Sequence, residues 1–153
     1  MAKKSDAELV SNRRAFHDYE ILETWEAGLA LLGTEIKSLR AHGGNLQDAY
    51  IIIADKTPIL KNASITPYRF GNIHNHEEKR ERTLLLHKRE IIKLKSILQE
   101  RGLTVIPLAL YLKNGVAKIK IASARGKKSY DKRSSLKEKD AKLDIARAYK
   151  EKQ

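Results

Sequence analysis

Histidines and carboxylates gather in one short segment of this 153-residue chain, and they are its most obvious candidates for chemistry. Residues 74–78 read His-Asn-His-Glu-Glu. Such groups can bind a metal, but two histidines two residues apart without a further cluster form a weak metal signal. The letters also match the name of the HNH nucleases, whose motif residues are widely spaced rather than contiguous. A metal-dependent nuclease therefore stays a minor alternative to a charged loop that contacts RNA or faces solvent.

Nucleophilic catalysis has no visible centre in the sequence. There is no cysteine, which excludes disulfides and thiolate zinc sites and favours a reducing cytoplasm. No serine lies in a G-x-S-x-G elbow, and neither a Walker A motif nor G-x-G-x-x-G is present. We therefore expect no enzymatic activity, no cofactor or metal, and no small-molecule substrate.

Basic side chains are the more informative group. The chain has 31 Lys and Arg against 19 Asp and Glu, a formal net charge of +12, which favours a polyanionic partner such as nucleic acid. Aromatic and imidazole rings accompany the basic residues, and an unstacked base can lie on such rings. The cationic positions are Arg13-Arg14, Lys37, Arg40, Lys79-Arg80, Arg82, Lys88-Arg89 and Lys127-Lys128, and the rings are His17, Tyr19, His87 and Tyr130.

A membrane location is not expected. The first 16 residues lack the apolar core of a secretory signal. The longest apolar stretch, residues 103–112, is too short to span a bilayer and contains Pro107. The sequence therefore predicts a soluble cytoplasmic protein without a membrane partner.

Short strands must position these residues. Alternation predicts a strand over residues 17–25, a turn at 26–28 and a second strand at 29–32, followed by a helix with Thr34 as its N-cap. Residues 54–57 and Asn114-Gly115 each predict a hairpin. Ile91, Leu94, Ile97 and Leu98 have helical spacing, with Gly102 as the stop.

The count of elements favours a mainly β fold: an antiparallel six-stranded barrel of the oligonucleotide-binding (OB) type with two or three external helices. A split α+β sheet is the alternative. We expect a flexible basic arm over residues 1–14, the barrel over 15–124 and a basic tail over 125–153. The tail has 11 Lys and Arg, five Asp and Glu, and little apolar surface, so we expect it to be disordered alone and helical along a polyanion.

Ordered motifs along almost the whole chain resemble one known family. They are Asn12-x-x-Ala15-x-His17-x-Tyr19-x-Ile21, Glu26-Ala27-Gly28-x-x-Leu31-x-Gly33-Thr34-Glu35-Ile36-Lys37-Ser38-Leu39-Arg40, Asp48-x-Tyr50, Ile65-Thr66-Pro67-Tyr68, Asn75-His76, Arg80-x-Arg82, Leu84-Leu85-Leu86-His87-Lys88 and Gly126-Lys127-Lys128-x-x-Asp131-Lys132-Arg133. Together they closely resemble the bacterial SsrA-binding protein family, also called small protein B.

The resemblance implies a non-enzymatic factor that binds the tRNA-like domain of transfer-messenger RNA and delivers it to stalled ribosomes for trans-translation. The implied RNA contacts are Asn12, Arg13, His17, Glu26, Lys37, Arg40, Arg80, Arg82, Leu85 and His87. The implied ribosome-binding tail, which enters the decoding centre and mRNA channel and contacts ribosomal RNA, comprises Gly126, Lys127, Lys128, Tyr130, Asp131, Lys132, Arg133, Lys137 and Arg147. A structural ribosomal or ribosome-assembly protein is the alternative function.

Overall fold

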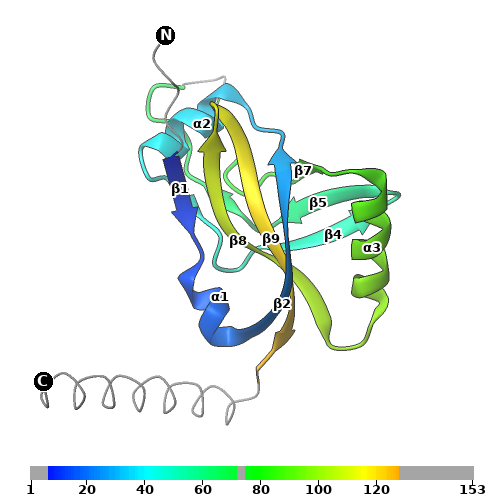
Figure 1. The fold of residues 1–153 in the computed structure, drawn as a ribbon. Coiled ribbons are helices and arrows are strands. Elements are labelled where there is room, and N and C mark those ends of the chain that lie inside the picture. The colour runs from blue at the N-terminus through cyan, green and yellow to red at the C-terminus, as the bar shows by residue number, and fades with distance from the viewer. Residues whose placement is uncertain (1–6, 72–74, 128–153) are drawn as a thin grey trace, which may run out of the picture.

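The computed structural model describes residues 7–71 and 75–127. Nine strands and three helices form in this part of the chain (Figure 1). The helices are α1 (Arg13–Asp18), α2 (Gly33–Arg40) and α3 (Lys88–Gln99). The strands are β1 (Ala7–Ser11), β2 (Tyr19–Leu29), β3 (Gly44–Asn45), β4 (Tyr50–Ala54), β5 (Thr57–Lys61), β6 (Ser64–Ile65), β7 (Arg82–Leu85), β8 (Leu103–Lys113) and β9 (Val116–Gly126).

Seven strands form one antiparallel sheet in the order β1-β8-β9-β2-β7-β5-β4, and β3 and β6 form a separate pair. The strands β4 and β8 are distant in the hydrogen-bonded order but pack against each other, which shows that the sheet is curled. The helices lie outside this curled sheet, α3 beside β4 and β8 and α1 beside β2 and β8 (Figure 1). The predicted mainly β fold with external helices is confirmed.

The main core fills the inside of the curled sheet. Long strands supply it with alternating side chains, among them Val105 and Leu110 of β8 and Ile119 and Ile121 of β9, and α3 contributes Leu94. A smaller apolar cluster lies between α1 and the outer side of β8 and β9. Burial of these aliphatic side chains fixes the barrel to which the functional side chains are attached.

Both predicted hairpins are present. Asp55 and Lys56 have φ angles of 46° and 68°, and Asn114 and Gly115 have 53° and 77°. Positive φ at both central residues is the turn geometry that suits the twist of antiparallel strands. The predicted long helix is confirmed as α3, which ends at Gln99, shortly before Gly102.

Several local predictions need correction. Residues 26–28 are not a turn, because β2 continues through them to Leu29. Thr34 is not an N-cap: α2 begins at Gly33, and Glu35 Oε1 accepts a hydrogen bond from the N–H of Leu32 at 2.8 Å. The sequence missed α1, β1, β3, β6 and β7. Residues 17 and 18, predicted as strand, belong to α1, and residues 30–32, predicted as a second strand, follow the end of β2 without forming one. The main sheet has seven strands rather than six.

The expected domain boundaries also shift. Residues 7–11, assigned to a flexible arm, form β1 and pair with β8. Residues 125–126, assigned to the tail, belong to β9, where Gly126 pairs with Tyr19. Among the residues described, no helix combines the length and apolar character needed to cross a membrane.

Candidate nucleic-acid interface

An open groove of about 480 Å³ lies where β2, β7, β9 and the start of α3 meet. Its lining includes three residues predicted separately from the sequence, namely Glu26, Leu85 and His87, together with Lys118. Strand pairing brings them together, because Gly28 is opposite both Leu85 of β7 and Lys118 of β9. A Cβ on Gly28 would lie only 3.1 Å from that of Leu85, so glycine permits the close approach that forms the groove wall.

Glu26 is held in the groove as an ionised acceptor. The hydroxyl of Tyr111 donates a hydrogen bond to its Oε2, and Lys113 Nζ lies 3.5 Å from its Oε1. The hydrogen bond from Tyr111 lowers the pKa of Glu26 by more than desolvation raises it, and the charge of Lys113 lowers the pKa further. Desolvation and the bond to Glu26 raise the pKa of Tyr111 to about 12, so this hydroxyl stays a donor. The carboxylate can therefore accept from base or ribose groups.

Leu85 and His87 give the groove an apolar surface and a ring. Leu85 is 62 % exposed and so leaves apolar surface open in the groove. His87 is exposed at the N-cap of α3, where its backbone N–H donates to Glu90 Oε1 at 3.1 Å. An exposed apolar side chain beside an imidazole and Lys118 suits the face and the phosphate of one nucleotide.

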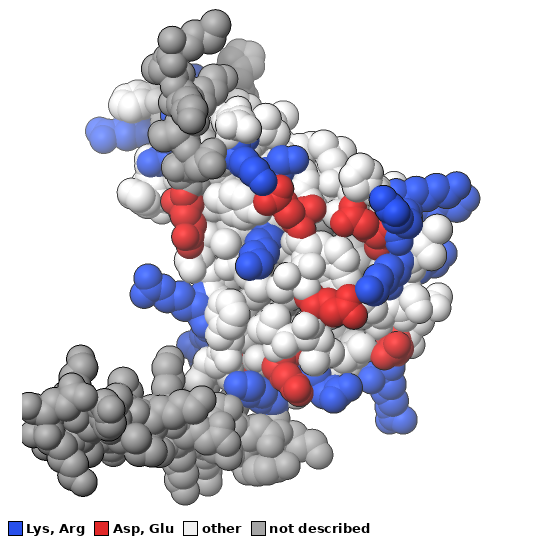
Figure 2. Space-filling model, in the orientation of Figure 1, with Lys and Arg blue, Asp and Glu red and all other residues white. Residues whose placement is uncertain are grey.

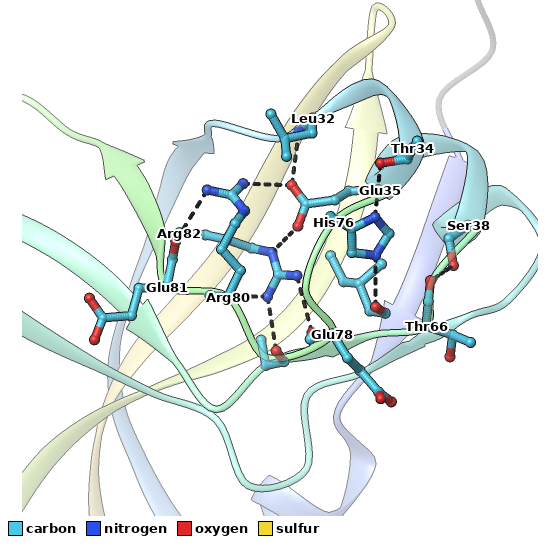
Figure 3. Close-up of polar contacts among 12 residues, drawn as sticks. Leu32, Thr34, Glu35, Ser38, Thr66, His76, Glu78, Arg80, Glu81 and Arg82 are labelled. Atoms are coloured by element: carbon cyan, nitrogen blue, oxygen red, sulfur yellow. Dashed lines mark hydrogen bonds and ion pairs between the residues drawn. The ribbon is translucent and has the colours of Figure 1, made fainter. Parts of the chain in front are cut away.

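Arg82 is buried and does not reach the surface, so the predicted direct RNA contact needs correction (Figure 3). Its Nε donates to Glu35 Oε2 at 2.5 Å, and its terminal nitrogens donate to the carbonyls of Ala63, Arg80 and Glu78. Arg80, partly exposed, donates to Glu35 Oε1 at 2.6 Å. Two arginines thus share one buried carboxylate, which joins α2 to β7 and the loop before it.

Glu35 stays ionised at the centre of this network. Burial raises its pKa, but hydrogen bonds from Arg80 and Leu32 and the charge of Arg82 outweigh that effect and hold the pKa below its usual value. Arg82 retains a partner for its charge as a result, which a buried guanidinium requires.

Asn12 is also largely buried, and its amide nitrogen is used within the barrel. It is 5 % exposed, and its Nδ2 donates to the carbonyls of Leu46 and Pro107 at 3.2 and 2.8 Å. The other predicted contacts on the helices are exposed: Arg13 and His17 on α1, and Lys37 and Arg40 on α2. They lie outside the lining of the groove.

Basic side chains are spread over the face shown in Figure 2 rather than forming one block, and acidic side chains lie between them. On α2, Lys37 Nζ lies 5.6 Å from the centre of the Tyr68 ring. On α1, His17 Nδ1 is 3.0 Å from Asp18 Oδ1.

The start of the predicted tail is attached to α1. The backbone N–H of Lys127 donates to the carbonyl of Asp18 at 2.9 Å, and its Nζ donates to the carbonyl of Phe16 at 3.4 Å. The predicted tail positions Lys128, Tyr130, Asp131, Lys132, Arg133, Lys137 and Arg147 lie outside the described residues.

The minor metal hypothesis receives no support from the described residues. Both ring nitrogens of His76 are engaged, Nδ1 with Thr34 Oγ1 at 2.9 Å and Nε2 with the Ile65 carbonyl at 2.8 Å (Figure 3). No group of three His, Cys, Asp or Glu side chains within residues 7–71 and 75–127 is placed to hold a metal. His74 lies outside these ranges.

Sequence reasoning missed Gly28, Lys118, Tyr111 and Lys113 as parts of the groove or its support. A signal was available for three of them. Alternation after the Asn114-Gly115 turn places Lys118 and Lys120 on the face opposite Ile119, and the hairpin register pairs Tyr111 with Lys118. Counting residue pairs back from the predicted Asn114-Gly115 turn would have placed Lys113, Tyr111 and Lys118 on one face of the hairpin.

A small basic antiparallel barrel, with a groove that combines a fixed carboxylate, an exposed leucine, an imidazole and a lysine, has the features of the nucleic-acid-binding class of OB-type barrels. Residues 9–151 match the family model described as "SmpB protein". The chain belongs to this family.

Individual relatives agree. The chain is 60 % identical over 151 residues to the SsrA-binding protein of Protochlamydia amoebophila, covering 99 % of both chains. It is 52 % identical to the SsrA-binding protein of Bacillus cytotoxicus, covering 100 % of this chain and 99 % of the relative. A solved structure described as "tmRNA-SmpB: a journey to the center of the bacterial ribosome" is 46 % identical, with a TM-score of 0.68, over 78 % of this chain and 85 % of that chain.

Proposed function

We propose that this protein binds the tRNA-like domain of transfer-messenger RNA and delivers it to stalled ribosomes for trans-translation. The observation that carries the proposal is the convergence of Glu26, Leu85, His87 and Lys118 on one groove. Membership of the SmpB family and the tmRNA–ribosome setting of a 46 % identical neighbour support the same partner. The protein acts in the cytoplasm as a binding factor and not as an enzyme.

The barrel and the tail divide the work in this proposal. The groove grips the RNA through Glu26, Leu85 and His87, while Arg13, His17, Lys37, Arg40 and Arg80 contact its backbone. Arg82 and Asn12 support these contacts from within the barrel. Residues beyond 127 form the tail, which enters the decoding centre and the mRNA channel and contacts ribosomal RNA.

A comparison of affinities tests the partner. A gel shift with the full-length protein should show tighter binding to transfer-messenger RNA than to ordinary tRNA or bulk ribosomal RNA. Equal affinity for ribosomal RNA would contradict the proposal and favour a structural ribosomal or ribosome-assembly protein.

Truncation tests the division of work. The chain should be cut after Lys127 rather than at 124, because β9 continues to Gly126 and Lys127 is bonded to Asp18. We expect the truncated protein to keep its affinity for transfer-messenger RNA and to lose peptide tagging on stalled ribosomes. Loss of RNA binding on truncation would refute the two-part model.

A further inference from the structure

A second, smaller pocket of about 190 Å³ lies at the other end of β2 from the groove. It is lined by Asn12 at the start of α1, Asp18 and Tyr19 at the α1–β2 junction, residues 47–50 before and at the start of β4, and Ile106 of β8. Sites for whole small ligands typically have about 300–1,000 Å³. This pocket therefore suits one heterocyclic ring of a larger partner.

Two acceptor groups in the pocket have no hydrogen-bond partner within the described part of the chain. Asp48 is exposed and makes no hydrogen bond or ion pair with the described part of the chain. Asn12 lines the pocket with its amide nitrogen already bonded to Leu46 and Pro107, so its Oδ1 is the side-chain atom left for a ligand. Neither acceptor belongs to the groove of Glu26 and Leu85.

Aromatic rings complete the lining. Tyr50 is 37 % exposed and Tyr19 is half-buried, and both line the pocket with apolar support from Ile106. A protein that takes a base out of a stack reads its edge with hydrogen bonds and covers its faces with aromatic or apolar side chains. The pocket offers both kinds of contact.

Charge outside the pocket suits the rest of a nucleotide. On α1, Arg14 Nε lies 3.4 Å from Asp18 Oδ2 and His17 Nδ1 lies 3.0 Å from its Oδ1, so this carboxylate is compensated. Arg13 is exposed on the same helix. The cations of α1 can receive a phosphate outside the pocket, whereas the carboxylate of Asp48 repels phosphate and accepts the donors of a base.

We propose that this pocket binds a single unstacked guanine of an RNA. Guanine presents two donors on its Watson–Crick edge, N1–H and the N2 amino group, and one carboxylate can accept both, whereas adenine offers only its amino group. The inference rests on the proposed RNA-binding function and adds a second contact to it. Glu26 lies seven positions after Tyr19 along β2, about 23 Å of extended strand, so groove and pocket take different nucleotides.

Short labelled RNAs test the base preference with the full-length protein. The probes are heptamers of uridine with guanine, adenine or inosine at the centre, and fluorescence anisotropy gives each Kd. We expect the guanine probe to bind about fivefold or more tighter than the adenine probe, as one bidentate base contact provides. Inosine, which lacks the N2 amino group, should lie between them.

Three variants locate the preference. Asp48→Asn should bring the guanine-to-adenine ratio to within about twofold, because the amide supplies only one acceptor. Asp55→Asn removes the same charge at the exposed turn on the far end of β4 and should leave the ratio unchanged. Glu26→Gln changes the acceptor of the groove and shows whether any base preference arises there instead. Thermal melting checks that each variant is folded.

The outcomes are decisive. Equal affinity of wild-type protein for the guanine and adenine probes overturns the inference, as does a guanine preference that survives Asp48→Asn. A preference abolished only by Glu26→Gln would assign it to the groove. If the pocket inference fails in these ways while transfer-messenger RNA is still preferred over tRNA, the proposed function stands. If that preference is absent, the proposed function fails whatever the heptamers show.

Discussion

Replacing Glu35 by glutamine should strongly destabilise the barrel, although the side chain keeps its size. Glu35 is fully buried and accepts hydrogen bonds from Arg80 at 2.6 Å, Arg82 at 2.5 Å and the backbone of Leu32 at 2.8 Å. The amide removes the charge that compensates Arg82, which has no exposed surface. Leaving one member of a buried ion pair uncompensated costs about 3–5 kcal/mol.

A cost of this size is a large share of the stability of a domain, which is typically about 5–15 kcal/mol. For a chain of this length it corresponds to a fall in Tm of roughly 6–20 °C. Urea denaturation followed by circular dichroism measures the free energy of unfolding directly, and an unchanged m value would show that the unfolding transition still exposes the same surface.

A matched control is available on the surface. Glu23→Gln removes the same charge from a pair with Lys93 at 2.7 Å, in which both side chains are more than half exposed. Exposed pairs of this kind contribute less than about 1 kcal/mol. If Glu35→Gln lowered the free energy of unfolding no more than Glu23→Gln does, the inference that Glu35 stabilises the fold by compensating the buried Arg82 would be refuted.

Three further outcomes follow from the same contacts. The pKa of Glu35 is lower in the folded than in the unfolded chain, so the ionised carboxylate stabilises the fold above the usual carboxyl pKa, and this stabilisation is lost as the pH falls through the pKa of the folded state. Urea denaturation below about pH 4.5 should therefore show a falling free energy of unfolding in the wild type and a smaller fall in Glu35→Gln. Leu85→Ala should weaken the affinity for transfer-messenger RNA about threefold to tenfold. Its Tm should stay almost unchanged, because this leucine is 62 % exposed. An equal loss of affinity in Val116→Ala, at an exposed hairpin position, would contradict a specific contact of Leu85. Lys37→Ala should reduce the slope of log Kd against log salt by about 0.7–0.9, and an unchanged slope would exclude a phosphate contact at this position.

Features encoded over a few residues were predictable from the sequence. The Asn114-Gly115 turn and α3 depend on local φ preferences and on helical spacing, which any window of the chain reveals. Residues 26–28 were misjudged because glycine in a short window reads as a turn. Gly28 instead lies within β2, where the absence of a Cβ allows the side chain of Leu85 to approach from the neighbouring strand.

Contacts between residues far apart in the sequence explain why the role of Arg82 was predicted incorrectly. The basic sequence around Arg80 and Arg82 reads as a phosphate-binding patch, and nothing nearby indicates that Arg82 points inward. Strand alternation in β7 buries Arg82 and Leu84 together and exposes Leu85, and the carboxylate that permits this lies 47 residues earlier at Glu35. The charge of an arginine shows its affinity for anions, but whether the anion is a phosphate or a buried carboxylate depends on tertiary contacts.

Strand β2 sets the spatial relation between the proposed RNA grip and the start of the tail. Its Glu26 and Gly28 form part of the groove, while Tyr19 at its other end pairs with Gly126, and Lys127 is bonded to Asp18 just before the strand. Because β2 pairs with β9 along most of its length, it cannot shorten or pivot without breaking many hydrogen bonds (Figure 1). A flexible linker of similar length would leave the separation variable. The fold therefore fixes where the chain leaves the barrel relative to the proposed RNA-binding groove.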